Sequence, residues 1–377
     1  MRIVHLTSVH VWRDVRIFER MCRSLARDGH EVHLVAPRDR AAETEEADGV
    51  LVHSVARPSG RWERVRATRR EIVARARAID ADLYHFHDPD LLRLMAALRE
   101  RSGKPVVYDV HEDYRAQILS KSWLPTGSRH LVAWWFGRFE DRFSKALSAI
   151  VAATPHIARR FAGHPRLGAH PLCELVQNFP DLREFPSSDK ETSDHDPGRF
   201  IFVGEITAIR GIREILEAVA LAGSGTRLAL GGPWEDPAFR DEMRRLEGWR
   251  QVEELGYLER PSVREEMARS AAGLALFPPL PNHVHSQPTK LFEYMAAGIP
   301  VIASDFPHWR EIIEGAGCGL LADPTDPSDI ARAMREVLDR PEEAREMGRR
   351  GRRAVVERYN WASEYVKLAA LYRRIAV

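Results

Sequence analysis

The order of apolar and polar positions along the chain predicts a regular alternation of buried strands and amphipathic helices. Short apolar runs, each long enough for a strand covered on both faces, alternate with segments whose apolar residues recur every three or four positions. A helix expected at Asp14–Asp28 stands between the first two strands, which implies a right-handed crossover and a parallel sheet. The strands expected in the first half are Arg2–Ser8, Glu31–Ala36, Val50–Val55, Leu83–Phe86, Val106–Asp109 and Ala149–Ala152.

The second half repeats this pattern after a polar segment. Residues 181–199 (DLREFPSSDKETSDHDPGR) are rich in Pro and Ser and lack periodicity, so they are expected to form a linker. The strands expected beyond it are Phe200–Val203, Arg227–Gly231, Val252–Leu255, Gly273–Phe277, Val301–Ala303 and Cys318–Ala322. The sequence therefore predicts an α/β protein with two doubly wound, Rossmann-like domains, residues 1–180 and 200–360, that face each other across a ligand-binding cleft.

Length and composition narrow the class of protein. A chain of 377 residues fits about two domains, and its 44% hydrophobic and 29% charged residues are typical of a globular protein. The net charge of +1 argues against nucleic acid as a general partner. No apolar run reaches the length of a membrane span, and the N-terminal MRIVHLTSV predicts a strand and not a signal peptide. Three widely separated cysteines without metal-site spacing indicate a reducing, cytoplasmic setting.

The most informative stretch is Asn282–Asp305, which reads as a polar loop, a short helix, a Gly-Ile-Pro break and a buried strand. Pro288 is expected at the first helical position with Gln287 or Ser286 as the cap. Glu293 follows inside the helix, where burial without a partner would be costly. The stretch is either a capped helix on a sheet or a pocket for an anionic ligand such as a nucleotide sugar. The side chains delivered to this helix N-terminus are those of His285, Ser286, Gln287 and Thr289.

Several segments resemble family 4 glycosyltransferases of the GT-B fold, and together they span nearly the whole chain. They are HLTSVHVWRDVRIFERMCRSLARDGHEV near the N-terminus, FIFVGEITAIRGIREILEA from Phe200, PTKLFEYMAAGIPVIASD from Pro288 and REIIEGAGCGLLA from Arg310. The resemblance implies retaining transfer of a sugar from a nucleotide diphosphate donor to an acceptor hydroxyl, without a metal or another cofactor. It also implies that the final helix, residues 361–377, crosses back onto the N-terminal domain.

The resemblance places donor-binding and catalytic residues in the second domain. Relatives carry an Arg and, five residues later, a Lys after its first strand; here Glu205 and Arg210 follow that strand, with Gly204 before them. Arg210 would grip the diphosphate in a fork. Glu205 reverses the expected charge and would meet an amine or hydroxyl of donor or acceptor, unless the diphosphate is held differently.

The paired glutamates of the family fall on His285 and Glu293. Glu293 would accept hydrogen bonds from the ribose hydroxyls, while His285 stands where a carboxylate usually contacts the donor sugar. A neutral imidazole can still accept one hydrogen bond there. Lys290 is either a further cation of the site or a solvated surface lysine.

In the first domain, the segment YDVHED resembles the one that brings a histidine to the reacting sugar, which makes His111 a candidate catalytic residue. Glu112 and Asp113 are candidates for the acceptor side. In the loop after the first strand, Arg13 and Arg16 either draw an anionic acceptor or a phosphate, or are surface arginines.

Two further patterns admit more than one interpretation. His85 and His87 lie on one face of a strand, but without a third placed ligand a strand end at a ligand site is favoured over a metal site. Residues 61–77 and 123–145 interleave basic and aromatic side chains. They predict either contact with an anionic membrane or a solvated face above a packed stripe.

The sequence thus predicts a cytoplasmic glycosyltransferase, with contact at the inner face of the membrane left open. Its acceptor would be a glycan, a glycolipid or a small metabolite, in polysaccharide, lipopolysaccharide or glycoconjugate synthesis. The alternatives are a catalytically silent sugar-nucleotide-binding partner subunit, motivated by Glu205 and His285, and a sugar-nucleotide epimerase of the same fold.

Overall fold

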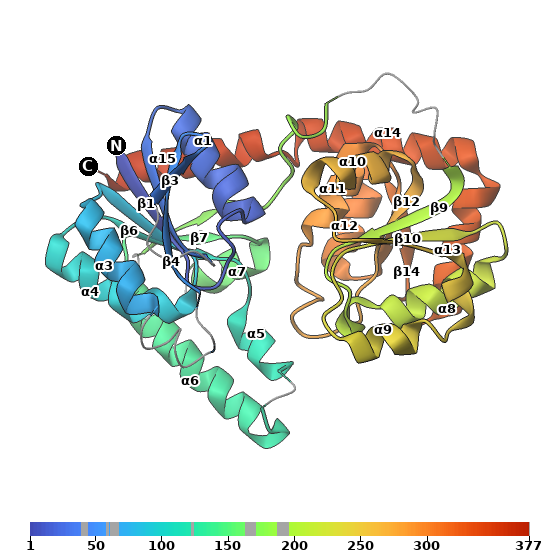
Figure 1. Cartoon of the computed structure of the whole chain (residues 1–377), viewed down its shortest axis with the longest axis horizontal. Helices are drawn as coiled ribbons and strands as arrows, with labels where there is room; N and C mark the ends of the chain where they lie inside the picture. Colours follow the sequence, from blue (N-terminus) through green and yellow to red (C-terminus); the bar gives the residue numbers. More distant parts are fainter. Residues whose placement is uncertain are drawn as a thin grey trace. The chain divides into compact units, whose positions relative to one another are not determined.

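The computed structural model describes residues 1–38, 44–57, 60, 68–121, 124–162, 171–186 and 196–376. The chain forms two compact units (Figure 1). The first comprises Met1–Asn178 together with Trp361–Val377, and the second comprises Phe179–Asn360. Residues 61–67 and Trp123, which belong to the two basic and aromatic segments noted in the sequence, lie outside the described residues.

The first unit is built on an eight-stranded sheet with the order β3-β4-β2-β1-β5-β6-β7-β8. All its neighbouring strands run parallel except β3, which pairs antiparallel with β4. The sequence did not predict β3 or β8. For β3 the reason is its sequence, TEEA, which forms a charged edge strand without an apolar face. The strands are β1 Arg2–Leu6, β2 Glu31–Arg38, β3 Thr44–Ala47, β4 Val50–Ala56, β5 Leu83–Phe86, β6 Val106–Val110, β7 Ala149–Ala152 and β8 Leu172–Leu175.

Helices cover both faces of this sheet (Figure 1). Successive residues of β1 point to opposite faces: Ile3 packs with η1 and α15, whereas Val4 packs with α3 and α4. The first helix departs from the expected α-helix, because Val15–Cys22 forms a π-helix (η1) before α1 begins. The helical segments are η1 Val15–Cys22, α1 Arg23–Arg27, α3 Arg69–Ile79, η3 Pro89–Leu91, α4 Leu92–Ser102, α5 Tyr114–Leu119, α6 Thr126–Ser144, α7 Pro155–Phe161 and α15 Trp361–Ile375.

The last helix, α15, packs on the first unit. The indole of Trp361 donates a hydrogen bond of 2.8 Å to Ser24, and the carboxylate of Glu364 accepts one of 2.8 Å from the backbone of Gln177. Both Trp361 and Glu364 are buried. Residues from opposite ends of the chain therefore share one core.

The second unit has a six-stranded parallel sheet with the order β11-β10-β9-β12-β13-β14. Its first strand starts earlier than the sequence predicted, because Asp196–Arg199 belong to β9 and not to the linker. The guanidinium of Arg199 is buried and ion-paired with Glu253 at 2.9 Å, which explains how a polar segment enters a sheet. The strands are β9 Asp196–Val203, β10 Arg227–Gly231, β11 Val252–Gly256, β12 Ser270–Ala275, β13 Val301–Ser304 and β14 Gly319–Ala322.

Two cores lie on the two faces of this sheet. Ile201 of β9 packs with α10, α11 and α12, and its neighbours Phe200 and Phe202 pack with α8 and α13. The helical segments are η4 Ala208–Arg210, α8 Ile212–Ala222, α9 Pro237–Met243, η5 Glu247–Gln251, α10 Arg260–Ala268, α11 Thr289–Ala297, α12 Pro307–Ala316, α13 Pro327–Asp339 and α14 Pro341–Glu357. The predicted α/β class is confirmed, and no helix among the described residues is long and apolar enough to cross a bilayer.

Candidate functional site

Two glycines form the floor of a site at the carboxyl ends of β9 and β10. Gly204 and Gly232 have φ angles of +137° and +141°, which favour glycine. A Cβ on Gly232 would lie 1.9 Å from the carbonyl oxygen of Gly204, and a Cβ on Gly204 would lie 3.0 Å from the ammonium of Lys290. Side chains are therefore excluded where the two loops meet, and the backbone around Gly204 stays close to Lys290.

Lys290, in the first turn of α11, holds its amine over aromatic rings. Its Nζ lies 3.6 Å from the centroid of the Phe202 ring and 5.3 Å from that of Phe277. Burial lowers its pKa well below the ordinary value and nearby Arg210 lowers it further, while Glu293 opposes the shift. Within the described part of the chain, no carboxylate lies within ion-pairing distance of Lys290. A bound anion would supply the missing countercharge.

Arg210 brings a guanidinium to one of the same rings. Its guanidinium carbon lies 4.6 Å from the centroid of Phe277, the ring that also faces Lys290. The turn that carries Arg210 ends at Gly211, where φ is +71° and a Cβ would lie 2.6 Å from the carbonyl oxygen of Leu276. Glu205 is exposed. The charge reversal at Glu205 is thus accompanied by a cation, Lys290, that reaches the same loop from another element.

The N-terminus of α11 differs from the sequence prediction. The helix begins at Thr289 with Pro288 as its cap residue, and no side chain caps it. The predicted caps have other partners: the Ser286 hydroxyl donates to the carbonyl of His283 at 2.8 Å, and the Gln287 amide oxygen lies 3.2 Å from the ring of His308. A helix N-terminus without a side-chain cap leaves backbone N–H groups for an anionic ligand.

The loop before α11 is held by two buried side chains that sequence reasoning missed. Trp309 donates from its indole nitrogen to the carbonyl of Ser286 at 2.7 Å, and His283 hydrogen-bonds the carbonyl of Pro278 at 3.0 Å. Both side chains are buried, whereas His285 is exposed. The loop therefore presents His285 from a fixed backbone. Aromatic residues at these positions read only as core, so no sequence signal marked them.

Glu293 is buried and ion-paired. Its Oε1 lies 2.7 Å from Nη1 of Arg260, and the same guanidinium contacts Glu184 at 3.0 Å. Burial alone would lower the pKa of Arg260, but the carboxylates of Glu293 and Glu184 outweigh it and raise the pKa. Arg260 thus fixes the orientation of the Glu293 side chain. No sequence signal marked this role, because Arg260 stands in a highly charged helical segment.

In the first unit, a buried carboxylate gathers the groups around His111. Asp109, at the end of β6, accepts hydrogen bonds from Arg16 at 2.9 and 2.7 Å, from His87 Nδ1 at 3.0 Å and from His111 Nε2 at 2.8 Å. Burial raises the pKa of Asp109, but Arg16 and the imidazoles outweigh this and hold it well below its usual range. The side chain of His111 is thereby held with Nε2 directed at Asp109, which leaves Nδ1 for another partner.

A third imidazole joins the pair that the sequence indicated on β5. The register of β1 on β5 places His5 opposite His85, and His5 Nδ1 is hydrogen-bonded to His87 Nε2 at 3.0 Å. The sequence could not place this third imidazole, which the pairing of β1 with β5 supplies. Two groups have the donor atoms for a metal ion, all within 4.8 Å of one another: His5, His85 and His87, and His87, Asp109 and His111.

His10 is a further charged group beside His111 that the sequence did not single out. The two rings lie 4.9 Å apart, and the His10 nitrogens lie 3.4 Å from carboxylate oxygens of Asp14 and Asp88. Burial lowers its pKa, but Asp14 and Asp88 outweigh burial and raise the pKa to about 9. His10 is therefore an imidazolium at neutral pH.

The other sequence candidates of the first unit have partners or lie at the surface. Arg16 is buried against Asp109, so it is not an exposed acceptor-binding arginine. Arg13 is exposed and stacks over Trp12 at 4.5 Å. Asp113 caps α5, accepting from the backbone of Arg115 at 3.1 Å. Glu112 is exposed.

Comparison with known proteins finds glycosyltransferase relatives for both halves of the chain. A family model described as Glycosyltransferase Family 4 matches residues 15–178, and one described as Glycosyl transferases group 1 matches residues 185–354. A D-rhamnosyltransferase of Pseudomonas aeruginosa is 25% identical over 291 residues, covering 72% of this chain and 68% of the relative. A glycogen synthase of Mycobacterium tuberculosis is 22% identical over 298 residues, covering 77% and 68%.

Solved structures share the fold over nearly the full length. A sucrose-phosphate synthase from Thermosynechococcus elongatus superposes with a TM-score of 0.78 at 17% identity, covering 99% of this chain and 98% of that one. The Anabaena protein HepE, solved in complex with UDP-glucose, superposes with a TM-score of 0.72 at 15% identity, covering 99% and 100%.

Proposed function

Because this chain belongs to the family 4-like glycosyltransferases of the GT-B fold, we propose that it transfers a sugar from a nucleoside diphosphate donor to an acceptor hydroxyl with retention of anomeric configuration. One observation carries the proposal. Lys290 is half-buried, with its amine over the Phe202 ring beside Arg210 and Gly204, at a helix N-terminus that no side chain caps. Such a group of cations and backbone donors fits a diphosphate.

The diphosphate site would act on the leaving group. As the bond from the anomeric carbon to the phosphate oxygen breaks, negative charge builds on that oxygen, and Lys290, Arg210 and the N-terminus of α11 stabilise it. The acceptor hydroxyl forms the new bond to the anomeric carbon and gives its proton to the leaving phosphate oxygen. Because the leaving phosphate oxygen takes the proton, the reaction requires no pair of carboxylates at the spacing found in glycosidases.

Glu293 would receive the ribose of the donor. A carboxylate fixed by Arg260 at 2.7 Å is suited to accept hydrogen bonds from vicinal hydroxyls. His285, exposed on the loop held by Trp309, would select among donor sugars. A neutral imidazole there offers one acceptor where a carboxylate would offer more, so donor choice is expected to differ from that of relatives with glutamate.

The first unit would contribute His111 to the transfer. Asp109 holds its ring through Nε2, and the neighbouring imidazolium of His10 adds positive charge at the same edge of the sheet. We propose that His111 contacts the transferred sugar or its phosphate and that His10 attracts an anionic part of a substrate. Glu112 and Arg13 remain proposed for the acceptor side because both are exposed.

We propose that no metal takes part. The two oxygens of Asp109 already accept hydrogen bonds from Arg16, so a cation is present where a metal ion would bind, and His5 and His87 are hydrogen-bonded to each other. The setting we propose is the cytoplasmic face of an anionic membrane. The acceptor would be a growing glycan, a glycolipid or a small metabolite, in polysaccharide, lipopolysaccharide or glycoconjugate synthesis.

A donor panel tests the proposal. The purified full chain is offered UDP-, GDP-, TDP- and ADP-sugars, and release of the nucleoside diphosphate is measured together with the anomeric configuration of the product. Turnover of at least one donor with a retained configuration is expected. The second candidate is a silent partner subunit, favoured by the exposed Glu205 in the diphosphate loop. Tight binding of a donor without hydrolysis or transfer would support that candidate and contradict the enzyme.

A further inference from the structure

Helix α6 carries large apolar side chains on its exposed face. Leu131, Trp134 and Trp135 are 59%, 53% and 63% exposed. Among the tryptophans that the structure describes, Trp134 and Trp135 are the two exposed ones; the remaining ones are buried or half-buried. Exposed neighbouring aromatic residues of this size on a globular protein mark an interaction surface.

Basic residues continue the same face. At 3.6 residues per turn, Leu131, Trp134, Trp135, Arg138 and Arg142 fall within roughly 100° of the helix circumference. We call this set the α6 stripe. The guanidinium of Arg138 lies 5.3 Å from the centroid of the Trp134 ring, so charged and aromatic groups are in contact within the stripe.

The acidic residues of α6 do not add negative charge to the surface of the stripe. Glu140 and Asp141 are buried; Glu140 contacts Arg115 at 3.8 Å and is ion-paired with Arg160, and Asp141 is ion-paired with Arg115. Their charges are therefore compensated inside the unit. The exposed charged side chains that the structure describes along α6 are all positive.

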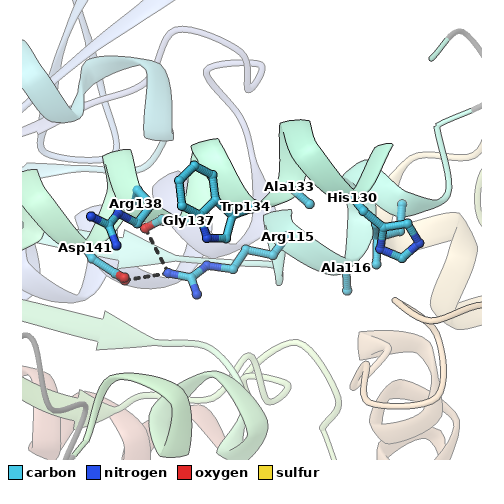
Figure 2. Close-up of a pocket in the computed structure, with 9 residues that line it drawn as sticks. Arg115, Ala116, His130, Ala133, Trp134, Gly137, Arg138 and Asp141 are labelled. Atoms are coloured by element: carbon cyan, nitrogen blue, oxygen red, sulfur yellow. Dashed lines mark hydrogen bonds and ion pairs between the residues drawn. The ribbon is translucent and has the colours of Figure 1, made fainter. Parts of the chain in front are cut away.

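A hollow of about 320 Å³ opens between α5 and α6, beside the tryptophans. Its apolar lining includes Ala116, Leu119, Ala133 and Trp134, and its polar lining comes from the side chains of Arg115, His130, Arg138 and Asp141. In Figure 2 the guanidinium of Arg115 points along the hollow to the carboxylate of Asp141 and the carbonyl of Gly137. The surface therefore offers both exposed aromatic rings and a recess beside them.

We propose that the α6 stripe docks onto an anionic lipid bilayer, with its tryptophans among the headgroups and Arg138 and Arg142 at the lipid phosphates. This inference rests on the proposed function at a membrane surface and names the part of the chain that makes the contact. Trp is suited to the boundary between headgroups and acyl chains, and arginines are attracted to anionic lipid. Because its polar residues occur along its whole length, α6 would lie along the interface and would not span it.

Charge selects this occupant over a second copy of the chain. Two copies meeting through the α6 stripe would bring Arg138 and Arg142 of each close to those of the other, which like-charge repulsion disfavours. An anionic bilayer instead supplies a countercharge for both arginines and an apolar layer for Leu131, Trp134 and Trp135 at the same time.

Flotation of the full chain with lipid vesicles tests the inference. Vesicles of phosphatidylcholine containing about a third phosphatidylglycerol are compared with vesicles of phosphatidylcholine alone. Wild type is expected to float with the anionic vesicles and to dissociate as salt rises. The double variant Trp134→Ser/Trp135→Ser should lose binding by roughly tenfold or more. Arg138→Gln/Arg142→Gln should lose the preference for anionic vesicles.

Leu221→Ser, at a leucine that is 54% exposed in the second unit, is the matched control and should bind as wild type. Donor turnover and thermal unfolding, measured without lipid, should be unchanged in all these variants. Unaltered flotation of the tryptophan variant, or equal binding to both kinds of vesicle, would overturn the inference, and so would a change in oligomeric state confined to that variant. If wild type floats with anionic vesicles but turns over no donor, the proposed function would be contradicted, while the inference about the docking surface would still hold.

Discussion

Arg16 and Asp109 form a two-pronged ion pair, 2.9 and 2.7 Å long, in which the two side chains are 4% and 0% exposed. The pair joins η1 to the end of β6, and His87 and His111 share the same carboxylate. Removing one partner of a buried pair leaves the other charge without compensation, which costs far more than the pair contributes by itself.

Asp109→Asn is therefore expected to destabilise the protein by about 3–5 kcal/mol. Urea unfolding followed by tryptophan fluorescence measures the change. Arg16→Met/Asp109→Asn is the control, because removing both charges should recover part of the loss. Since the pKa of Asp109 is depressed in the folded state, its contribution should be present above about pH 4 and lost as the pH falls below that. If Asp109→Asn were as stable as wild type, the Asp109 carboxylate would not be what holds His87 and His111 in place.

His10 predicts a second pH dependence of the opposite sign. Its pKa is raised from 6.5 to about 9 by Asp14 and Asp88, so its stabilisation is complete below pH 6.5 and is lost as the pH rises through about 9. We expect wild type to lose about 1–3 kcal/mol of unfolding free energy across this range. His10→Gln should show a flatter profile. If the unfolding free energy of both proteins changed with pH by the same slope, His10 would not be an imidazolium that stabilises the folded state.

Chelation tests whether the histidine groups hold a metal that the reaction needs. Dialysis against EDTA is expected to leave donor turnover unchanged, because Arg16 supplies the cation at Asp109. Elemental analysis of the purified chain accompanies the assay. Turnover that falls on dialysis and returns with added Zn²⁺ would contradict metal-independent transfer and assign the ion to one of the two histidine groups.

Glu293 is expected to bind the ribose hydroxyls. Glu293→Gln should weaken binding of a nucleoside diphosphate by about 10- to 100-fold, the range for hydrogen bonds to a charged group. The 2′,3′-dideoxy form of the same nucleotide is the matched probe, because it lacks the hydroxyls and should bind wild type and variant alike. Calorimetric titration measures both. An equal loss for the two nucleotides would mean that the substitution acts through Arg260 and the loop, not through the ribose.

The sequence predicted most of the fold because its strands are buried on both faces. Runs such as Val106–Asp109 and Val301–Ala303 have no competing interpretation once Gly and Pro bound them. The edge strand β3 was missed because its stability depends on pairing with β4 and not on an apolar pattern. The π-helical start of η1 was missed because its apolar spacing resembles that of an α-helix.

The candidate site was less predictable, because it depends on contacts between segments far apart in the sequence. Lys290 reads equally well as a surface lysine until Phe202 of β9 and Phe277 after β12 are seen to face it. His5 becomes a neighbour of His85 only through the register of β1 on β5. Arg260 meets Glu293 through the packing of α10 on α11. None of these distances can be read from residue types or spacing.

The most direct test of the account compares the binding of a nucleoside diphosphate with that of the corresponding monophosphate, in wild type and in Lys290→Met. The methionine keeps the apolar stem over Phe202 and removes the charge. Calorimetry should show that wild type prefers the diphosphate, and that Lys290→Met loses about tenfold of this preference, or ~1.4 kcal/mol, while Lys104→Met, in a loop of the first unit, retains it. Equal binding of the two nucleotides by wild type, or an unchanged preference in Lys290→Met, would contradict the assignment of a diphosphate site to this loop.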